Sequence, residues 1–198
     1  MLMWFGLLRV GEAISTDTGR APDRATLRGD IQFHPSESDC QYLTFHVKSS
    51  KTDQFREGFT LTIYRSGVPG FCPVESILAL FSAYPQPPHS PLFDFHNVEP
   101  TEPKRHASRT SFIKLLKRSF KAAGVDDRGV KSHSFRQGGA SAAAMSNPTY
   151  VVRMLGRWSS DCWMRYVSMP LTHLQIISRG MATVPRVPGT QTDFVMYQ

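Results

Sequence analysis

The sequence predicts one α+β domain that is mainly α-helical and carries a small antiparallel β-hairpin at one edge. Two runs of alternating apolar residues, at 41–48 and 59–65, have the two-residue period of half-buried strands. From residue 73 onward the apolar spacing is that of helices, with proline, glycine and small polar residues at the expected helix ends. A chain of 198 residues that is 40% apolar is long enough for one such domain with its own core.

The first half of the chain is expected to contain the hairpin and little other regular structure. Residues 3–15 are interpreted as a helix end that runs into a turn, and residues 17–38 as a loop with short strands around 31–33. In the hairpin, Leu43, Phe45 and Val47 share one face, and the polar segment 49–58 forms the tip.

Helices are predicted over most of the remaining chain. Pro73 occupies the first turn of a helix that continues to residue 84, and a proline-rich connection reaches residue 103. Segment 108–123 has the pattern of a basic amphipathic helix that Gly124 closes. Three short helices follow: one capped by Ser132, one from Pro148 to Gly156, and one that carries Tyr166 and ends at Pro170.

Positive charge is concentrated in one segment. The formal net charge is +7, but the segment from Lys104 to Arg136 alone has ten basic and two acidic residues, a local charge of +8. Such a segment predicts a phosphate-backbone partner, although a solvated helix face has a similar composition. The residues expected to contact that backbone are Lys104, Arg105, Arg109, Lys114, Lys117 and Lys131.

Other classes of site have weak support. Three scattered cysteines fit neither a disulfide framework nor a zinc site, and no paired carboxylates have the spacing of metal ligands, so neither a metal nor a cofactor is expected. No glycine-rich phosphate loop is present, and no small-molecule substrate is expected. The apolar residues 1–8 are too few for a membrane span, so no membrane partner is expected.

One constellation near the C-terminus contains the groups that cut a phosphodiester without a metal. His133 and Arg136 are three residues apart and are expected on one helical face; the segment 155–160 and Tyr166 follow. A guanidinium can hold non-bridging phosphate oxygens, an imidazole can transfer a proton and a phenol can act as nucleophile. Because a single tyrosine is usually a packing residue, the prediction depends on this spacing.

The pattern H-x-x-R, then L-G-R-W-S-S, then Y resembles the catalytic domain of tyrosine recombinases of the phage-integrase type. The motif GRWSS is most similar to that of the eukaryotic branch of the family, which is encoded by DIRS-like retroelements and Cryptons. The resemblance implies that fold over residues 1–180, without the family's N-terminal DNA-clamping domain. Residues 181–198 contain prolines and few apolar anchors and are expected to form a flexible tail. The resemblance also implies double-stranded DNA as the partner and cleavage through a 3′-phosphotyrosine on Tyr166, without metal or ATP.

The resemblance assigns further residues of the same site. Arg9 stands in a segment similar to L-R-x-G-E, which supplies the family's first catalytic arginine, and Lys51 in one similar to the hairpin whose lysine is the general acid. Most relatives have histidine or tryptophan directly after the glycine, where this chain has Arg157, with Trp158 one residue later. Either Arg157 is a further phosphate-binding cation or Trp158 takes the indole's role.

Three functions are compatible with these observations. The leading one is a site-specific recombinase or integrase, which in its full-length form acts as a homotetramer on paired DNA sites. The second is a truncated or domesticated DNA-binding module of mobile-element origin that lacks catalysis. The third is a type IB topoisomerase, which uses similar residues. The resemblance to mobile elements implies an intracellular, nuclear location.

Overall fold

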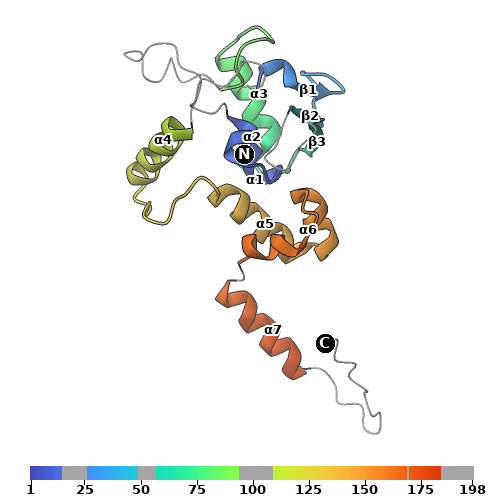
Figure 1. The fold of residues 1–198 in the computed structure, drawn as a ribbon, viewed down its shortest axis with the longest axis vertical. Helices are drawn as coiled ribbons and strands as arrows, with labels where there is room; N and C mark the ends of the chain where they lie inside the picture. The colour runs from blue at the N-terminus through green and yellow to red at the C-terminus, as the bar shows by residue number, and fades with distance from the viewer. Residues whose placement is uncertain (15–25, 49–56, 94–108, 169, 184–198) are drawn as a thin grey trace. The chain divides into compact units, whose positions relative to one another are not determined.

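The computed structural model describes residues 1–14, 26–48, 57–93, 109–168 and 170–183 (Figure 1). The chain has the predicted α+β class, with several helices and one three-stranded antiparallel sheet. It divides into two compact units, Met1–Val167 and Ser168–Gln198. The second unit contains α7 (Leu171–Thr183), a helix that was not predicted, and the domain end expected at residue 180 falls within it. Residues 184–198 of the predicted tail lie outside the described residues.

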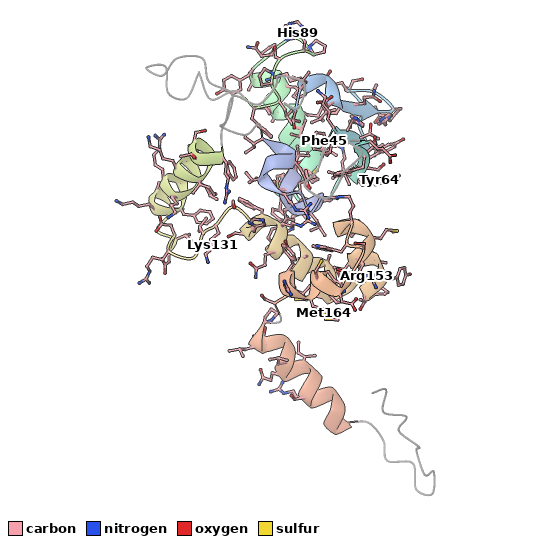
Figure 2. All side chains as sticks on the ribbon, in the orientation of Figure 1. Phe45, Tyr64, His89, Lys131, Arg153 and Met164 are labelled. Atoms are coloured by element: carbon pink, nitrogen blue, oxygen red, sulfur yellow. The ribbon has the colours of Figure 1, made fainter. Side chains whose placement is uncertain are left out.

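The predicted hairpin is confirmed. Strands β2 (Tyr42–Val47) and β3 (Phe59–Tyr64) pair antiparallel, with Phe45 opposite Leu61. Strand β1 (Ile31–His34) pairs with the other edge of β2, in the segment expected to contain short strands. Side chains alternate along each strand. Phe45 of β2 is fully buried, whereas Tyr64 of β3, next to the buried Ile63, is exposed; Figure 2 labels Phe45 and Tyr64.

The main core lies where the sheet packs with three helices. Helix α3 (Pro73–Ala83) begins at its predicted proline and buries Val74 and Ile77. Two short helices, α1 (Leu2–Phe5) and α2 (Val10–Ala13), occupy the segment interpreted as a single helix end. Leu7 lies between them with a φ of +45°, which interrupts the right-handed helix. A short 3-10 helix, η2 (Arg28–Asp30), leads into β1.

The predicted basic helix is α4 (Arg109–Ala122), and Gly124 ends it in the left-handed conformation, with φ +70°. Its aromatic residue Phe112 packs against the main core and lies 6.2 Å, ring centre to ring centre, from Phe135. The loop to the next helix includes Lys131, which Figure 2 labels.

The next helices follow the prediction with two corrections. Helix α5 (Ser134–Ser146) has His133 as its N-cap, so the assignment of Ser132 as the cap is wrong. The Ser132 hydroxyl is instead engaged by Arg109 and His133. Helix α6 (Thr149–Gly156) follows Pro148 as predicted. Tyr166 is on a 3-10 helix, η3 (Asp161–Tyr166), which ends before Pro170.

A second, smaller core joins α5, α6 and η3 to the N-terminal segment. Leu7, Ala140, Val152 and Trp158 form its buried part. Gly139 permits the close packing, because a Cβ there would lie 2.3 Å from the Trp4 carbonyl oxygen. The two cores meet at the segment between α1 and α2, where the predicted arginines converge.

Candidate functional site

Arg136 is the centre of the site and is only 1% exposed. From α5, its Nη1 donates a hydrogen bond to the Leu7 carbonyl at 2.6 Å, and its Nη2 donates to the Gly156 carbonyl at 2.7 Å. One guanidinium thus joins the N-terminal segment to the end of α6. Burial is the main reason why the pKa of Arg136 is lowered to about 10; Arg9 lowers it further and Glu12 opposes the change. The side chain is therefore a cation at neutral pH.

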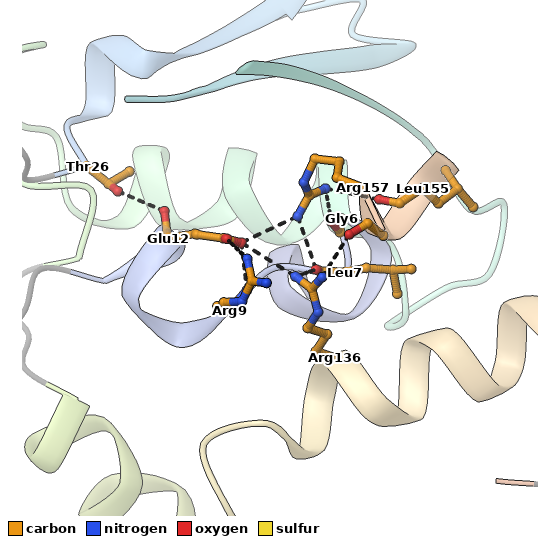
Figure 3. Close-up of polar contacts among 9 residues, drawn as sticks. Gly6, Leu7, Arg9, Glu12, Thr26, Arg136, Leu155 and Arg157 are labelled. Carbon is orange, nitrogen blue, oxygen red and sulfur yellow. Dashed lines mark hydrogen bonds and ion pairs between the residues drawn. The ribbon is translucent and has the colours of Figure 1, made fainter. Parts of the chain in front are cut away.

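Three guanidinium groups surround the carboxylate of Glu12 (Figure 3). Arg9 Nη1 lies 2.7 Å from Oε1, while Arg157 Nη2 and Arg136 Nη1 lie 3.4 and 3.7 Å from Oε2. We call Arg9, Glu12, Arg136 and Arg157 the arginine cluster. With three cations and one carboxylate it has a formal charge of +2, an excess suited to an anionic ligand.

The arginine cluster brings together residues that the sequence separates by more than 120 positions. Arg9, Arg136 and Arg157 were all predicted as site residues, and the structure places them around one carboxylate. Glu12 was predicted to support local structure, and its contacts reach much further. The spacing in L-R-x-G-E signals the contact between Arg9 and Glu12, but no sequence signal identifies the other two partners.

Arg157 makes several contacts with main-chain carbonyls. Its Nη1 donates to Gly6 and Leu155 at 3.1 and 3.0 Å, and its Nη2 donates to Leu7 at 3.2 Å. Its guanidinium also lies 4.3 Å above the Phe59 ring centre. Burial lowers the pKa of Arg157, while the Glu12 charge opposes that shift. In this geometry Arg157 holds α6 against the N-terminal segment and the sheet.

Two residues at the arginine cluster, one a member and one a contact of it, have unusual backbone conformations. Within the described ranges, the non-glycine residues with positive φ are Leu7, at +45°, and Arg157, at +56°. Arg157 caps the C-terminal end of α6, where glycine is the usual residue. Such conformations cost of order 1–3 kcal/mol each and are found preferentially at functional sites.

Trp158 and Tyr166 cover one side of Arg136. The Arg136 guanidinium carbon lies 4.7 Å from the Trp158 ring centre and 5.4 Å from that of Tyr166. The two rings are 5.2 Å apart. Trp158 is buried and Tyr166 is half-buried, so the phenol is the more accessible of the two. Between the two candidates for the position after the glycine, Trp158 is therefore the one packed against the tyrosine.

His133 lies at the edge of this arrangement. It directly precedes α5 and is exposed, whereas Arg136, three residues later, is buried. Its Nδ1 lies 3.2 Å from Ser132 Oγ, and Arg109 Nη2 donates to the same oxygen at 2.8 Å. The two side chains predicted to share one face therefore differ in environment: the imidazole is at the surface and the guanidinium is in the interior.

A basic surface accompanies the site. Arg109, Lys114 and Lys117 are exposed on α4, and Lys131 is exposed in the loop before α5. Lys104 and Arg105, also predicted to contact DNA, lie outside the described residues, as does Lys51, the predicted general acid.

Two buried donors of the site lack an acceptor within the part of the chain that the structure describes: Arg136 Nε and Trp158 Nε1. An unpaired buried donor is costly in a folded protein and suggests an acceptor supplied by water or a ligand. Among the described residues, no group of three or more His, Cys, Asp or Glu side chains could hold a metal ion. A helix long and apolar enough to cross the membrane is likewise not found among them.

No family model matches this chain, and no curated protein matches it either.

Proposed function

We propose that this chain is the catalytic domain of a tyrosine-type DNA recombinase or integrase, which cleaves and rejoins DNA through Tyr166. The observation that carries the proposal is the position of Arg136. A single buried guanidinium contacts the proposed nucleophile's ring, the Trp158 indole and the carboxylate that holds Arg9 and Arg157. Four residues assigned from scattered motifs thereby share one site with Tyr166.

In the proposed reaction the Tyr166 oxygen attacks a DNA phosphorus atom. The phenol releases its proton as a phosphorus–oxygen bond to tyrosine forms, the bond to the 5′-oxygen breaks, and the leaving oxygen takes up a proton. The cationic arginine cluster offsets the charge that develops on the non-bridging oxygens. His133 assists proton transfer or hydrogen-bonds the phosphate, and Lys51 is the general acid that the resemblance implies. The phosphotyrosine conserves the bond energy for rejoining, so neither ATP nor a metal is needed.

Further observations support the proposal. The net charge of the arginine cluster is of the sign that a phosphodiester requires, and basic residues of α4 extend the positive surface. The unpaired Arg136 Nε and Trp158 Nε1 provide donors for an oxygen ligand. The left-handed conformations of Leu7 and Arg157 also lie at the arginine cluster, and such conformations are found preferentially at functional sites. By analogy with the family, the protein would assemble as a homotetramer on paired DNA sites in the nucleus.

A suicide substrate tests the proposal directly. A duplex nicked just beyond the cleavage point loses the short leaving strand, which traps the phosphotyrosine as a covalent adduct that migrates slowly in denaturing gels. We expect an adduct with the wild-type chain, none with Tyr166→Phe, and an unchanged amount with Tyr150→Phe. Tyr150 is the matched control because it is an exposed tyrosine of α6. An adduct that persists in Tyr166→Phe would exclude Tyr166 as the nucleophile.

A DNA-binding module without catalysis is the second candidate, and a specific observation favours it. The Arg136 and Arg157 guanidinium groups donate to main-chain carbonyls, as guanidinium groups with a purely structural role do. This candidate predicts a folded protein that retards DNA in a gel and forms no adduct. A type IB topoisomerase, the third candidate, would relax supercoiled plasmid as a monomer.

A further inference from the structure

A second buried arginine is not a member of the arginine cluster. Arg28, in the short 3-10 helix η2, is only 6% exposed. Its Nε is buried and has no hydrogen-bond acceptor in the part of the chain that the structure describes. Nη1 and Nη2 receive no hydrogen bond or ion pair from those residues either, but, unlike Nε, they are not shielded from solvent. A guanidinium has five N–H donors, and the described residues supply no acceptor for those of Arg28.

The positive charge of Arg28 also lacks a counter-charge among the described residues. Asp30, the acid closest to it in sequence, accepts a hydrogen bond from Leu27 N–H at 2.7 Å and lies 3.0 Å from Lys48 Nζ. Burial lowers the pKa of Arg28, and no acid opposes that effect as Glu12 does within the arginine cluster. Because a buried charge is costly unless it is paired, the arrangement points to an anion that the fold itself does not provide.

The guanidinium of Arg28 is held in place from two sides. Its Cζ lies 4.7 Å from the centre of the Phe81 ring on α3. The main chain is fixed as well, because Arg28 N–H donates to the Ser90 carbonyl at 2.9 Å and Gly29 N–H donates to the Pro88 carbonyl at 2.8 Å. A side chain that is already ordered loses little further conformational entropy when it binds a ligand.

We propose that Arg28 is the centre of an oxyanion-binding site whose ligand is a phosphate group, held by Nη1 and Nη2. The planar fork of an arginine matches two oxygens of a phosphate, and the bound ligand supplies the counter-charge that Arg28 lacks. The phosphate group belongs either to a nucleic-acid backbone or to a small phosphate compound, and the experiment below separates these sources. The site goes beyond the proposed function, since it does not depend on cleavage by Tyr166.

A purely structural role for Arg28 makes a different prediction. If Arg28 only packs its stem on Phe81, phosphate stabilises the wild type and Arg28→Met equally. If Arg28 is an unpaired cation that binds phosphate, Arg28→Met is at least as stable as the wild type in buffer without phosphate, because a methionine still packs on the ring and no charge is buried. Phosphate then stabilises the wild type more than the variant, because it binds the folded state through Arg28.

Nitrogen-15 NMR of the arginine side chains in the full chain tests the site directly. The Nε–H signal of Arg28 should be observable, since that group is buried and exchanges slowly with water. It is assigned by its loss in Arg28→Met or, if that variant does not fold, in Arg28→Lys. We expect inorganic phosphate to shift the signal to saturation, and sodium chloride or acetate at the same ionic strength to leave it in place. No shift, or a shift that chloride or acetate reproduces, would overturn the proposal.

Thermal unfolding with and without phosphate gives a second readout. Arg128→Met is the matched control, because it removes the same charge from an exposed arginine that is paired with Asp126. Phosphate at ten times the dissociation constant of one site lowers the apparent unfolding constant about elevenfold. The arginine cluster can also bind phosphate, so the comparison between variants decides the result. We expect the wild type and Arg128→Met to gain equally and Arg28→Met to gain about elevenfold less. Equal gains in all three proteins would contradict a site at Arg28.

A titration with a short DNA duplex identifies the source of the phosphate group. If the duplex shifts the Arg28 signal, the ligand is the DNA backbone; if the duplex binds elsewhere and only inorganic phosphate shifts that signal, the ligand is a small phosphate compound. Both results support the site. The proposed function is judged separately by the suicide substrate. No adduct together with a phosphate-responsive Arg28 would remove the recombinase and leave the oxyanion site, whereas an adduct together with an unresponsive Arg28 would do the reverse.

Discussion

The Arg136 guanidinium carbon lies 4.7 Å from the centre of the Trp158 ring, stacked on the same indole that contacts Tyr166. Cation–π contacts of this kind are worth about 2 kcal/mol or more when water is excluded, and both residues are buried here. The guanidinium, the indole and the half-buried phenol of Tyr166 each contact the other two. The position of Trp158 is therefore a determinant of the environment of Tyr166.

The first prediction concerns the glycine that permits this contact. A Cβ on Gly156 would lie 1.8 Å from a ring carbon of Trp158, so Gly156→Ala must displace the indole. We expect a loss of about 1–3 kcal/mol in the free energy of unfolding by urea, typical of overpacking. A changed near-ultraviolet circular dichroism spectrum should accompany it. Gly129→Ala is the control, because a Cβ there meets nothing within 4 Å. Equal stability of the two variants would contradict the packing described here.

The second prediction compares two adjacent glycines of α5. A Cβ on Gly139 would lie 2.3 Å from the Trp4 carbonyl oxygen, whereas one on Gly138 would lie 2.4 Å from the Trp4 side chain. A side chain can rotate away but a backbone carbonyl cannot, so Gly139→Ala should be the more destabilising variant. We expect it to cost about 3 kcal/mol, and Gly138→Ala clearly less. Thermal and urea unfolding of both variants measure the difference in stability. If Gly138→Ala were the more destabilising variant, the Trp4 side chain would be held more rigidly than the Trp4 backbone.

Local patterns predicted much of the fold. The alternation of apolar residues identified β2 and β3, and Pro73 and Gly124 marked helix ends, because each of these signals depends on residues close in sequence. Helix α7 was missed because no element was assigned to the residues between Pro170 and the predicted tail. The Ser132 cap was wrong because a tertiary contact with Arg109 competes for the hydroxyl.

The candidate site was only partly predictable, because local signals do not show which distant residues come into contact. Motif spacing brought Arg136, Trp158 and Tyr166 into one hypothesis, but spacing cannot show that Glu12 contacts three arginines from separate segments. Nor can it distinguish an arginine that donates to main-chain carbonyls, as Arg157 does, from one that faces solvent. Both features depend on long-range contacts between the N-terminal segment and the residues of α5 and the end of α6, which no local pattern encodes.

The third prediction tests Glu12 as the shared carboxylate. Glu12→Gln removes the negative charge that faces three guanidinium groups and leaves Arg136 buried without its counter-charge. Breaking a buried ion pair costs about 3–5 kcal/mol, and we expect a loss of that size in the free energy of unfolding. Glu75→Gln is the matched control, since Glu75 is half-exposed in its ion pair with Arg65 and should cost less than about 1 kcal/mol. A similar small loss in both variants would mean that water reaches the arginine cluster.

The fourth prediction concerns the basic face of α4 and rests on the proposal that the chain binds DNA. Lys114 and Lys117 are exposed, so they are free to approach phosphates without disturbing the core. Each phosphate contact releases counterions and contributes about 0.9 to the slope of log affinity against log salt concentration. Replacing both lysines by alanine should therefore weaken binding at low salt and reduce that slope by about 2.

The control for this prediction separates location from net charge. Arg65→Ala together with Lys48→Ala removes the same two charges from residues at the ends of β3 and β2, where the side chains form ion pairs with Glu75 and Asp30. If DNA lies along α4, the control pair changes the salt slope far less than the Lys114 and Lys117 pair, whatever the sequence of the duplex. Equal slopes for the two pairs would show that the protein attracts DNA only through its overall charge, and the face of α4 would lose its assigned role.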